Sequence, residues 1–273
     1  APGGRMFDAE HFRLLPRHSL GASAIAQIPD DAALSAQTGL VPHLAHRQEI
    51  WDFPIGVEQA EYVALDLQGS TYPLEREPYV ADVKKLYADP RWSLVADCGG
   101  YLLFHRQAAE SVQTTNLRWP GVAELAGYEL AVENVAADAA ESCFVPVEGS
   151  PVQLGAGKRL RLTLYWRALG ATPQDLTVFT QLVREDGVLV GQHDSLPADV
   201  GLWPDVWVTI EAQHTSAWQP GQIVRDVHYI SLAPEATGQG DVLIGWYDGQ
   251  SSTRQSTAEG ADHAVLAHFA IQP

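Results

Sequence analysis

The stretch Leu160-Arg161-Leu162-Thr163-Leu164-Tyr165-Trp166-Arg167 alternates large apolar residues with polar ones. A period of two is typical of a β-strand with one buried face. This stretch belongs to a candidate strand at 159–168. Further candidate strands lie at 127–133, 143–147, 176–184, 188–193, 223–232, 241–248 and 264–271, with Gly- and Pro-containing turns between them and no helical pattern. Residues 125–273 are therefore predicted to form an antiparallel β-sandwich of the immunoglobulin or jelly-roll kind.

Residues 1–108 read differently, because candidate strands alternate with candidate helices. The predicted helices are 18–27, 38–47 and 77–88, and the predicted strands are 33–36, 50–53, 61–67 and a hairpin of 92–96 with 101–105. This order predicts a small α/β domain with a mainly parallel sheet and one antiparallel edge. Residues 109–124 are polar and rich in turn residues, which predicts a linker. The expected fold class is α+β with two domains.

The charge of the chain limits its partners. Its 273 residues include 34 acidic and 17 basic side chains, a formal net charge of −17. Such a surface repels phosphate backbones and anionic headgroups, so we expect no nucleic-acid partner and no peripheral membrane binding. Solubility is the simpler reason for the charge.

Cys98 and Cys143 are the only cysteines, one in each predicted domain. They cannot form a structural zinc site, and two separate thiols are favoured over a disulfide that would have to link the domains. The sequence has no apolar run long enough to span a bilayer. Residues 1–7 do not begin with Met and lack the apolar segment of a signal peptide, so we expect an internal starting point.

Two parts of the chain resemble known families. The first resemblance rests on short motifs that agree in order and spacing, namely Ile28-Pro29-Asp30-Asp31-Ala32, Pro42-His43-Leu44-Ala45-His46-Arg47, Phe53-Pro54, Tyr62-Val63-Ala64-Leu65-Asp66-Leu67 and Tyr101-Leu102-Leu103-Phe104-His105-Arg106. Over residues 15–106 the chain resembles the soluble C-terminal region of a family of bacterial polytopic membrane proteins of unknown function. That family is itself similar to membrane-embedded sugar transferases that use lipid-linked donors.

The second resemblance is to a β-sandwich module appended to similar glycosyltransferase-like membrane proteins. Its motifs are Leu125-Ala126-Gly127-Tyr128-Glu129-Leu130, Leu162-Thr163-Leu164-Tyr165-Trp166, Val178-Phe179-Thr180-Gln181-Leu182, Asp186-Gly187, Gln192-His193-Asp194, Trp218-Gln219-Pro220-Gly221 and Gly245-Trp246-Tyr247-Asp248. The chain departs from the pattern in a longer segment, Trp203 to Ser216, and at Arg254-Gln255, where an apolar residue usually follows the Arg. Packing at that edge is therefore open.

The resemblance implies an extracytoplasmic, membrane-attached location, at the cell surface or in the periplasm, with transmembrane helices upstream. The implied partners are those upstream helices or a membrane complex. In such enzymes the catalytic acidic residues lie on loops between membrane helices, so the resemblance implies no transferase activity for residues 1–273. It leaves open whether the full-length parent is a membrane glycosyltransferase.

Motifs for chemistry are weak. Gly155-Ala156-Gly157-Lys158 lacks the first Gly and the Ser or Thr of a phosphate loop, and it leads into a strand. His43 and His46 lack the i, i+4 spacing and the Glu of a helical zinc site. No nucleophile elbow or positioned acid–base pair is present. We therefore expect no catalytic residue, no metal and no cofactor.

Asp194, Asp199 and Asp226 form, with His193 and His228, the most polar cluster of the predicted sandwich. Carboxylates on neighbouring loops can bind calcium through six to eight oxygens, which makes the three aspartates a weak calcium candidate. Asp194 and Asp226 are better explained as acceptors for backbone N–H groups at strand ends.

Tryptophan provides the one candidate for ligand binding. Trp166 and Trp246 lie within strands and are predicted to pack in the core. Trp203 and Trp207 lie in the long segment beside Asp205, where indole rings could stack on a sugar and the carboxylate could accept its hydroxyls. The alternative is a loop folded over the edge of the sandwich.

These observations favour a non-catalytic binding or supporting region of a glycosyltransferase-like membrane protein. Its ligand would be a cell-envelope glycan, bound through Trp203, Asp205 and Trp207. The alternative is a structural or protein-interaction subunit of a larger membrane-associated assembly. A glycan hydrolase would need two facing carboxylates, which the sequence does not indicate.

Overall fold

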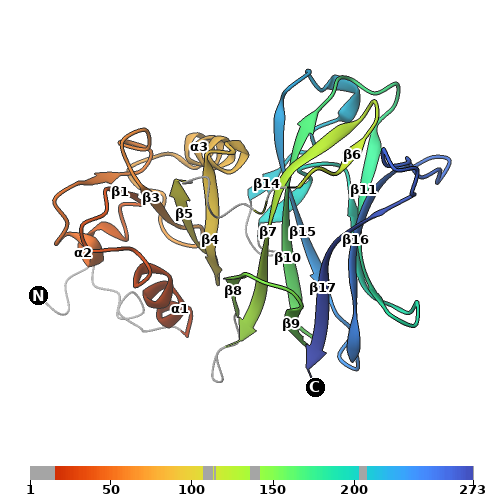
Figure 1. The fold of residues 1–273 in the computed structure, drawn as a ribbon. Helices are drawn as coiled ribbons and strands as arrows, with labels where there is room; N and C mark the ends of the chain where they lie inside the picture. The colour runs from red at the N-terminus through yellow and green to blue at the C-terminus, as the bar shows by residue number, and fades with distance from the viewer. Residues whose placement is uncertain (1–15, 107–112, 114, 136–141, 203–207, 273) are drawn as a thin grey trace, which may run out of the picture.

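The computed structural model describes residues 16–106, 113, 115–135, 142–202 and 208–272. The chain is mostly β with few helices, arranged as two β-rich parts that lie side by side (Figure 1). The first part contains α1 (Pro16–Ile25), β1 (Leu34–Ala36), α2 (Val41–Leu44), β2 (Ile50–Asp52), β3 (Tyr62–Asp66), α3 (Arg76–Ala88), β4 (Trp92–Cys98) and β5 (Tyr101–Arg106). The second contains β6 (Arg118–Trp119), β7 (Ala123–Val135), β8 (Ser142–Val147), β9 (Val152–Gly155), β10 (Arg159–Ala168), β11 (Leu176–Arg184), β12 (Leu189–Ser195), β13 (Val200–Leu202), β14 (Val208–Ile210), η2 (Thr215–Ala217), β15 (Ile223–Ser231), β16 (Gly238–Asp248) and β17 (Ala264–Gln272).

One mixed sheet of ten strands runs through both parts in the order β15-β10-β7-β8-β4-β5-β3-β1-β2, with β6 beside β7. In the first part β1 pairs in parallel with β2 and β3, whereas β3–β5 and β5–β4 are antiparallel. The sheet of this part is thus equally parallel and antiparallel, rather than mainly parallel. The predicted hairpin is present as β4–β5, but β4 is not an edge strand because β8 pairs with its far side.

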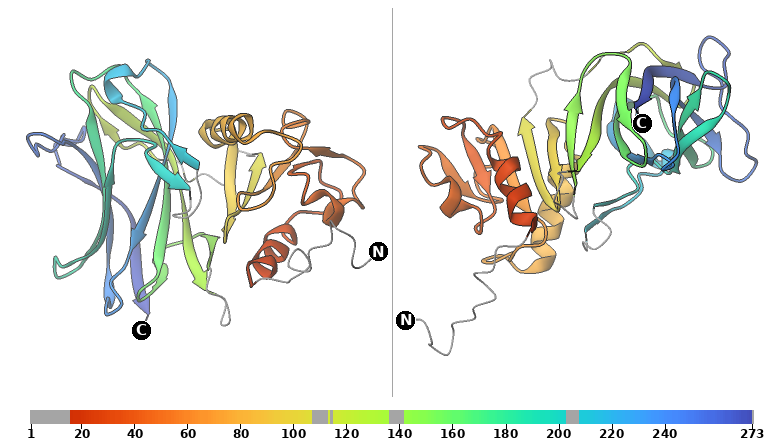
Figure 2. Two further views of the ribbon diagram at one scale, coloured as in Figure 1. Left: turned by 180° about the vertical axis from the view of Figure 1, so that it is seen from behind. Right: turned by 90° about the horizontal axis from the view of Figure 1, so that it is seen from below.

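A second, curled sheet of five strands has the order β12-β11-β16-β17-β9. It packs against β7, β10 and β15 across a shared hydrophobic core (Figure 2). Trp166 and Trp246, both fully buried, lie in this core with ring centroids 4.7 Å apart, which confirms their predicted place. On one side the sheets approach closely, because β12 lies against β15. A Cβ added to Gly191 would lie 2.9 Å from the carbonyl oxygen of Ser231.

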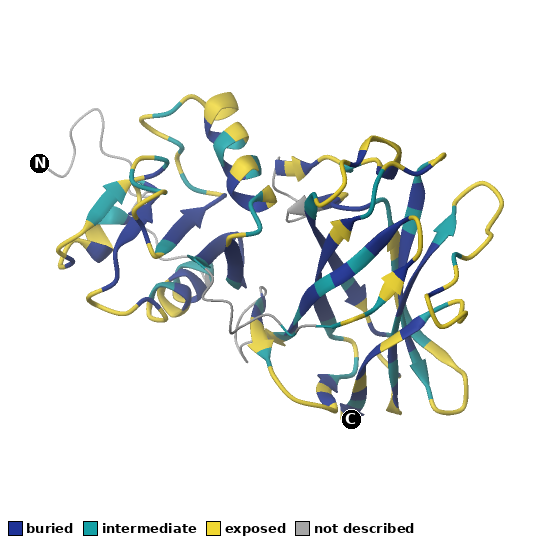
Figure 3. Cartoon of the chain, turned by 45° about the horizontal axis from the view of Figure 1, so that its top comes forward, coloured by how far each residue is buried: buried dark blue, intermediate teal, exposed yellow. Residues whose placement is uncertain are grey.

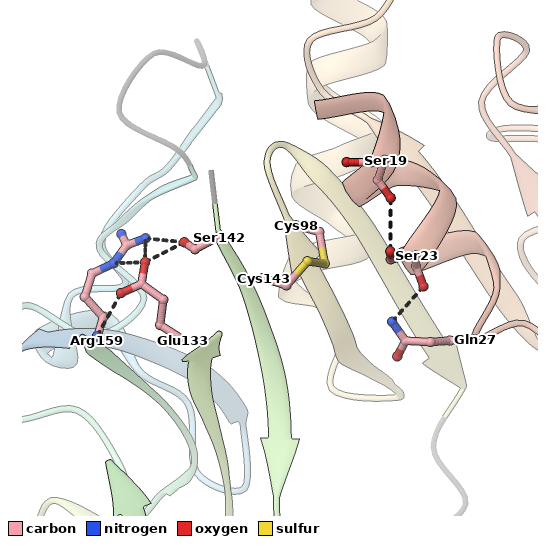
Figure 4. The surroundings of a disulfide bond; sticks show 8 residues. All are labelled: Ser19, Ser23, Gln27, Cys98, Glu133, Ser142, Cys143 and Arg159. Carbon is pink, nitrogen blue, oxygen red and sulfur yellow. Dashed lines mark hydrogen bonds and ion pairs between the residues drawn. A yellow bond between two sulfur atoms is a disulfide. The ribbon is translucent and has the colours of Figure 1, made fainter. Parts of the chain in front are cut away.

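The two parts are joined covalently. Cys98 of β4 pairs in register with Cys143 of β8, and the two residues form a disulfide with a Cα–Cα distance of 4.0 Å (Figure 4). The expectation of two separate thiols was wrong, because the strands of the two parts continue one sheet at this point. Beside the disulfide, Arg159 donates to Glu133 over 2.7 Å and also contacts Ser142, which fixes the end of β8.

A buried polar seam accompanies the join. In β10 both faces are buried, since Leu162 and Leu164 face the sandwich core while Arg161 faces the first part. Arg161 donates to the carbonyl oxygen of Leu94 over 2.6 Å, and Arg225 of β15 donates to that of Tyr87 over 2.9 Å. The hydroxyl of Tyr229 donates to Asp97. Figure 3 shows that strand interiors are buried in both parts, whereas the outer loops are exposed.

The hairpin β13–β14 adds a third connection. Its buried side chains Val200, Val208 and Ile210 belong to the same hydrophobic cluster as Val83 and Leu86 of α3. Lys84 of α3 forms an ion pair with Glu211, next to β14. The sandwich thus extends an arm onto a helix of the first part.

The predicted linker, 109–124, is only partly described, because residues 107–112 and 114 lie outside the described residues. Its later residues include β6, which pairs with β7. Trp119 of β6 is fully buried, with its ring 5.5 Å from that of Trp166.

Candidate functional site

The three residues predicted from the sequence to bind a sugar, Trp203, Asp205 and Trp207, lie outside the described residues. The strands on either side of them, β13 and β14, are described, and their side chains pack against α3. The base of this segment therefore serves to connect the two parts.

The three aspartates of the calcium candidate occupy different environments. Asp194 and Asp199 are exposed, whereas Asp226 is 1% exposed and faces the core. Asp226 accepts from Trp166 Nε1 (3.0 Å), the backbone N–H of Ala198 (2.9 Å) and His228 Nε2 (2.9 Å). These bonds occupy both of its oxygens. Within the part of the chain that the structure describes, no three His, Cys, Asp or Glu side chains are grouped to hold a metal ion.

Asp226 begins a buried hydrogen-bonded chain between the two sheets. His228 Nδ1 lies 2.9 Å from His193 Nδ1 of β12. An ionised carboxylate only accepts, so His228 Nε2 donates to Asp226, and the Nδ1 atoms of His228 and His193 share the next hydrogen bond. Burial lowers the pKa of His193, and the neighbouring His228 lowers it further.

A polar surface covers the outer side of the five-stranded sheet. Alternate residues of β11 face the core, and the residues between them face outward. The strand register then sets the outward neighbours. Gln192 of β12, Gln181 of β11 and Leu243 of β16 form one row across the strands, and Asp194 lies beside Phe179 in the next. We call this surface, carried by Gln181, Gln192, Asp194, Tyr247 and Arg254, the outer face.

The outer face is held together by contacts among its own side chains. Tyr247 donates its hydroxyl to Asp194 Oδ2 over 3.3 Å. Arg254, bridged to Tyr247 through the backbone, stacks its guanidinium 4.3 Å from the ring centre of Phe179 and reaches Gln181 and Asp262. Only glycine fits at position 245, since an added Cβ would lie 2.5 Å from the Phe179 ring.

Partial burial raises the pKa of Asp194, against the opposing hydrogen bond from Tyr247. Burial also raises the pKa of the Tyr247 hydroxyl, with Asp194 adding to the effect. The Tyr247 hydroxyl therefore stays protonated at neutral pH and donates a hydrogen bond to the carboxylate of Asp194. Such an arrangement of carboxylate, amide, phenol and guanidinium suits the binding of hydroxyl groups and contains no nucleophile paired with a base.

Asp194 was a candidate from the sequence, whereas Gln181, Tyr247 and Arg254 were not predicted to form a site with it. Their segments were each quoted for the second resemblance, and the structure brings those segments together. The sequence departs from the family pattern at Gln255, and the Arg254 before it packs its guanidinium over the ring of Phe179 at this edge.

A separate cleft of about 430 Å³ lies in the first part, between the loop after β2 and the end of α3. Its charged side chains are paired with one another. Arg91 donates to Glu58 over 3.0 Å and to Asp89 over 2.9 Å, and Lys85 donates to Asp82 over 2.9 Å. These pairs explain the charges in the cleft without a ligand.

The remaining motifs also have structural places. Residues 155–158 form the turn between β9 and β10, as expected for a strand entry. His43 and His46 are exposed, and His46 lies 3.1 Å from Asp30. Among the described residues, no helix is long and apolar enough to cross a membrane.

Comparisons with known proteins assign this chain to no family. No protein-family model matches the chain, and no curated protein matches it. Among solved structures, the crystal structure of the C-terminal domain of Wzt is similar at a TM-score of 0.35 and 12% identity, over 57% of this chain and 77% of that one. A similarity this low carries no inference about function.

Proposed function

We propose that this chain is a non-catalytic, extracytoplasmic binding and supporting region of a glycosyltransferase-like membrane protein, and that it binds glycan through the outer face of its sandwich. The observation that carries the proposal is the outer face itself. There Gln181, Gln192 and Asp194 come from neighbouring strands, and Tyr247 and Arg254 border them.

The amide and carboxylate groups of the outer face are spaced for hydroxyl recognition. Side chains directly across paired strands lie about 5 Å apart, and those two residues apart along a strand lie about 7 Å apart. Gln181 and Gln192 have the first relation, and Gln192 and Asp194 the second. Neighbouring hydroxyl groups of an oligosaccharide can therefore be bound together.

The disulfide supports an extracytoplasmic location, because disulfides persist in oxidising compartments and are rare in the cytosol. The partners proposed are the upstream transmembrane region or a membrane complex. We also propose the finer assignment of the second part to the immunoglobulin or jelly-roll class of antiparallel sandwich. One pair departs from that pattern, since β9 and β17 are parallel.

Calorimetric titration with a panel of cell-envelope oligosaccharides tests the proposal. We expect saturable binding, weakened about tenfold or more by the double variant Gln192→Ala/Asp194→Ala, since each removes a hydrogen bond to the ligand. Both residues are exposed, so the fold should tolerate the change.

The variants Trp203→Ala and Trp207→Ala serve as the comparison. Loss of binding in these variants alone would move the site to the 203–207 segment and overturn the outer face as the site. If no oligosaccharide binds while the fold is intact, glycan binding is wrong and the alternative of a structural or interaction subunit replaces it.

A further inference from the structure

The charge of the outer face restricts which glycans it can bind; this inference rests on the proposed function. Three carboxylates lie on the face or at its rim, those of Asp194, Asp241 and Asp262. Arg254 is already paired with Asp262, over 3.1 Å. Arg254 and the three carboxylates together carry two formal negative charges in excess, on a chain whose formal charge is −17.

The hydrogen-bonding groups left for a ligand are acceptors and amides. Asp194 uses its Oδ2 for Tyr247, and no other described residue bonds to its Oδ1. The Gln192 amide has no hydrogen-bond partner among the described residues, and the Gln181 oxygen has only the long contact of 3.5 Å to Arg254. Hydroxyl groups can donate to Asp194 and exchange bonds with both amides. A carboxylate or phosphate on the ligand could not donate to Asp194, and its charge would be repelled.

We infer that the outer face selects uncharged, hydroxyl-rich glycans and rejects glycans that carry carboxylate or phosphate groups. Asp194 is the residue that sets this selection. It presents an ionised acceptor on β12, beside Phe179, where a neutral hydroxyl gains a charge-assisted hydrogen bond and an anionic group meets a like charge.

The test compares oligosaccharides of matched length by calorimetry. The uncharged probes are oligomers of glucose, galactose and mannose, and the anionic probes are oligogalacturonate and oligomannuronate. We expect at least one uncharged probe to bind, and the anionic probes to bind at least about tenfold more weakly at low salt. Salt screens the repulsion between exposed charges, with a screening length of about 10 Å at 0.1 M. The difference in affinity between uncharged and anionic probes should therefore shrink as salt is added.

Asp194→Asn should weaken binding of the uncharged probe about tenfold. It should also reduce the ratio of the affinity for the uncharged probe to that for the anionic probes. Asp241→Asn is the matched control, because Asp241 lies on the same face in a different row and is paired with His268 over 2.6 Å. We expect it to leave the affinity for the uncharged probe unchanged.

Three results would contradict parts of this picture in different ways. Equal affinity for uronates overturns the selection but leaves glycan binding in place. An unchanged affinity in Asp194→Asn overturns the role of that residue. A lack of binding to every probe, with the fold intact, overturns the proposed function and this inference with it.

Discussion

At the scale of single residues, Asp226 shows how this protein keeps a carboxylate between two sheets. A buried charge is tolerated only where donors replace the lost water. Asp226 has three, from Trp166, Ala198 and His228. Asp226 bonds Trp166 of β10 and His228 of β15, and His228 in turn contacts His193 of β12, so the side chains of three strands depend on it.

The stability of the protein should fall on mild acidification partly because of His193. Its pKa is lowered in the folded state, so below pH about 6.5 the unfolded chain binds this proton more readily than the folded one. Stability is therefore lost as the pH falls from about 6.5 toward the lowered pKa. Since the ring is only partly buried, the contribution should stay below about 1 kcal/mol.

Urea unfolding followed by tryptophan fluorescence at pH 7.5 and 5.5 measures this effect. We expect His193→Gln to lose less stability between the two pH values than the parent protein. Some slope should remain, because burial also lowers the pKa of His105. Identical slopes in the two proteins would show that His193 does not contribute.

Only part of this residue-level picture could be predicted from the sequence. Asp226 was expected to bond backbone N–H groups at a strand end, and it does accept from Ala198, but from the middle of β15. The members of the outer face could not be grouped in advance. Gln181, Asp194 and Tyr247 meet only because β11 pairs with both β12 and β16, which no local pattern reveals.

At the scale of elements, the arm β13–β14 connects the sandwich to α3. Its strands have three residues each, so they gain little from their own pairing. Their buried side chains pack instead with those of α3. The arm is thus stabilised by the helix that it covers.

Ile210→Ala tests the packing of this arm. The side chain is 6% exposed, and truncating a buried isoleucine costs about 2–5 kcal/mol. Thr209→Ala is the matched control, because Thr209 is the exposed neighbour on the same strand and should change stability by less than about 0.5 kcal/mol. Equal, small losses in urea unfolding for both variants would mean that the arm does not pack as described.

The elements with long, regular patterns were predicted best. The bounds of β10 and β11 agree with the alternation in the sequence. The arm was missed because three-residue strands are too short to show a period. The predicted helix at 38–47 is reduced to α2, because Thr38 does not begin a helix. The residue that precedes α2, Leu40, has no side chain that could cap it.

At the scale of the whole molecule, the two parts share one sheet. The sheet passes from one part to the other at two register pairs, Asp97 with Phe144 and Cys98 with Cys143. Such a short pairing between strands far apart in the sequence leaves no local signal, and so the two parts were predicted as separate domains. The buried arginines of the seam, Arg161 and Arg225, were hidden in the same way, since on an isolated sandwich they would be exposed.

Removing the disulfide should destabilise the whole chain. The bond closes a loop between residues 45 positions apart, for which the entropy of the unfolded chain predicts a stabilisation of about 4 kcal/mol. We expect Cys98→Ala/Cys143→Ala to lower the urea midpoint by a corresponding amount, and a reductant to lower that of the parent protein but not of the variant. Equal urea midpoints for the double variant, the parent protein and the reduced parent protein would contradict this.

The place of the disulfide also has a mechanical consequence. A pull on α1 against β17 loads the junction between β4 and β8, where two register pairs alone would separate one after the other. With Cys98 bonded to Cys143, the tension passes through a covalent bond instead. The chain between Cys98 and Cys143, a separation of 45 residues, therefore carries no tension. About 150 Å of chain cannot be extended while the disulfide is intact.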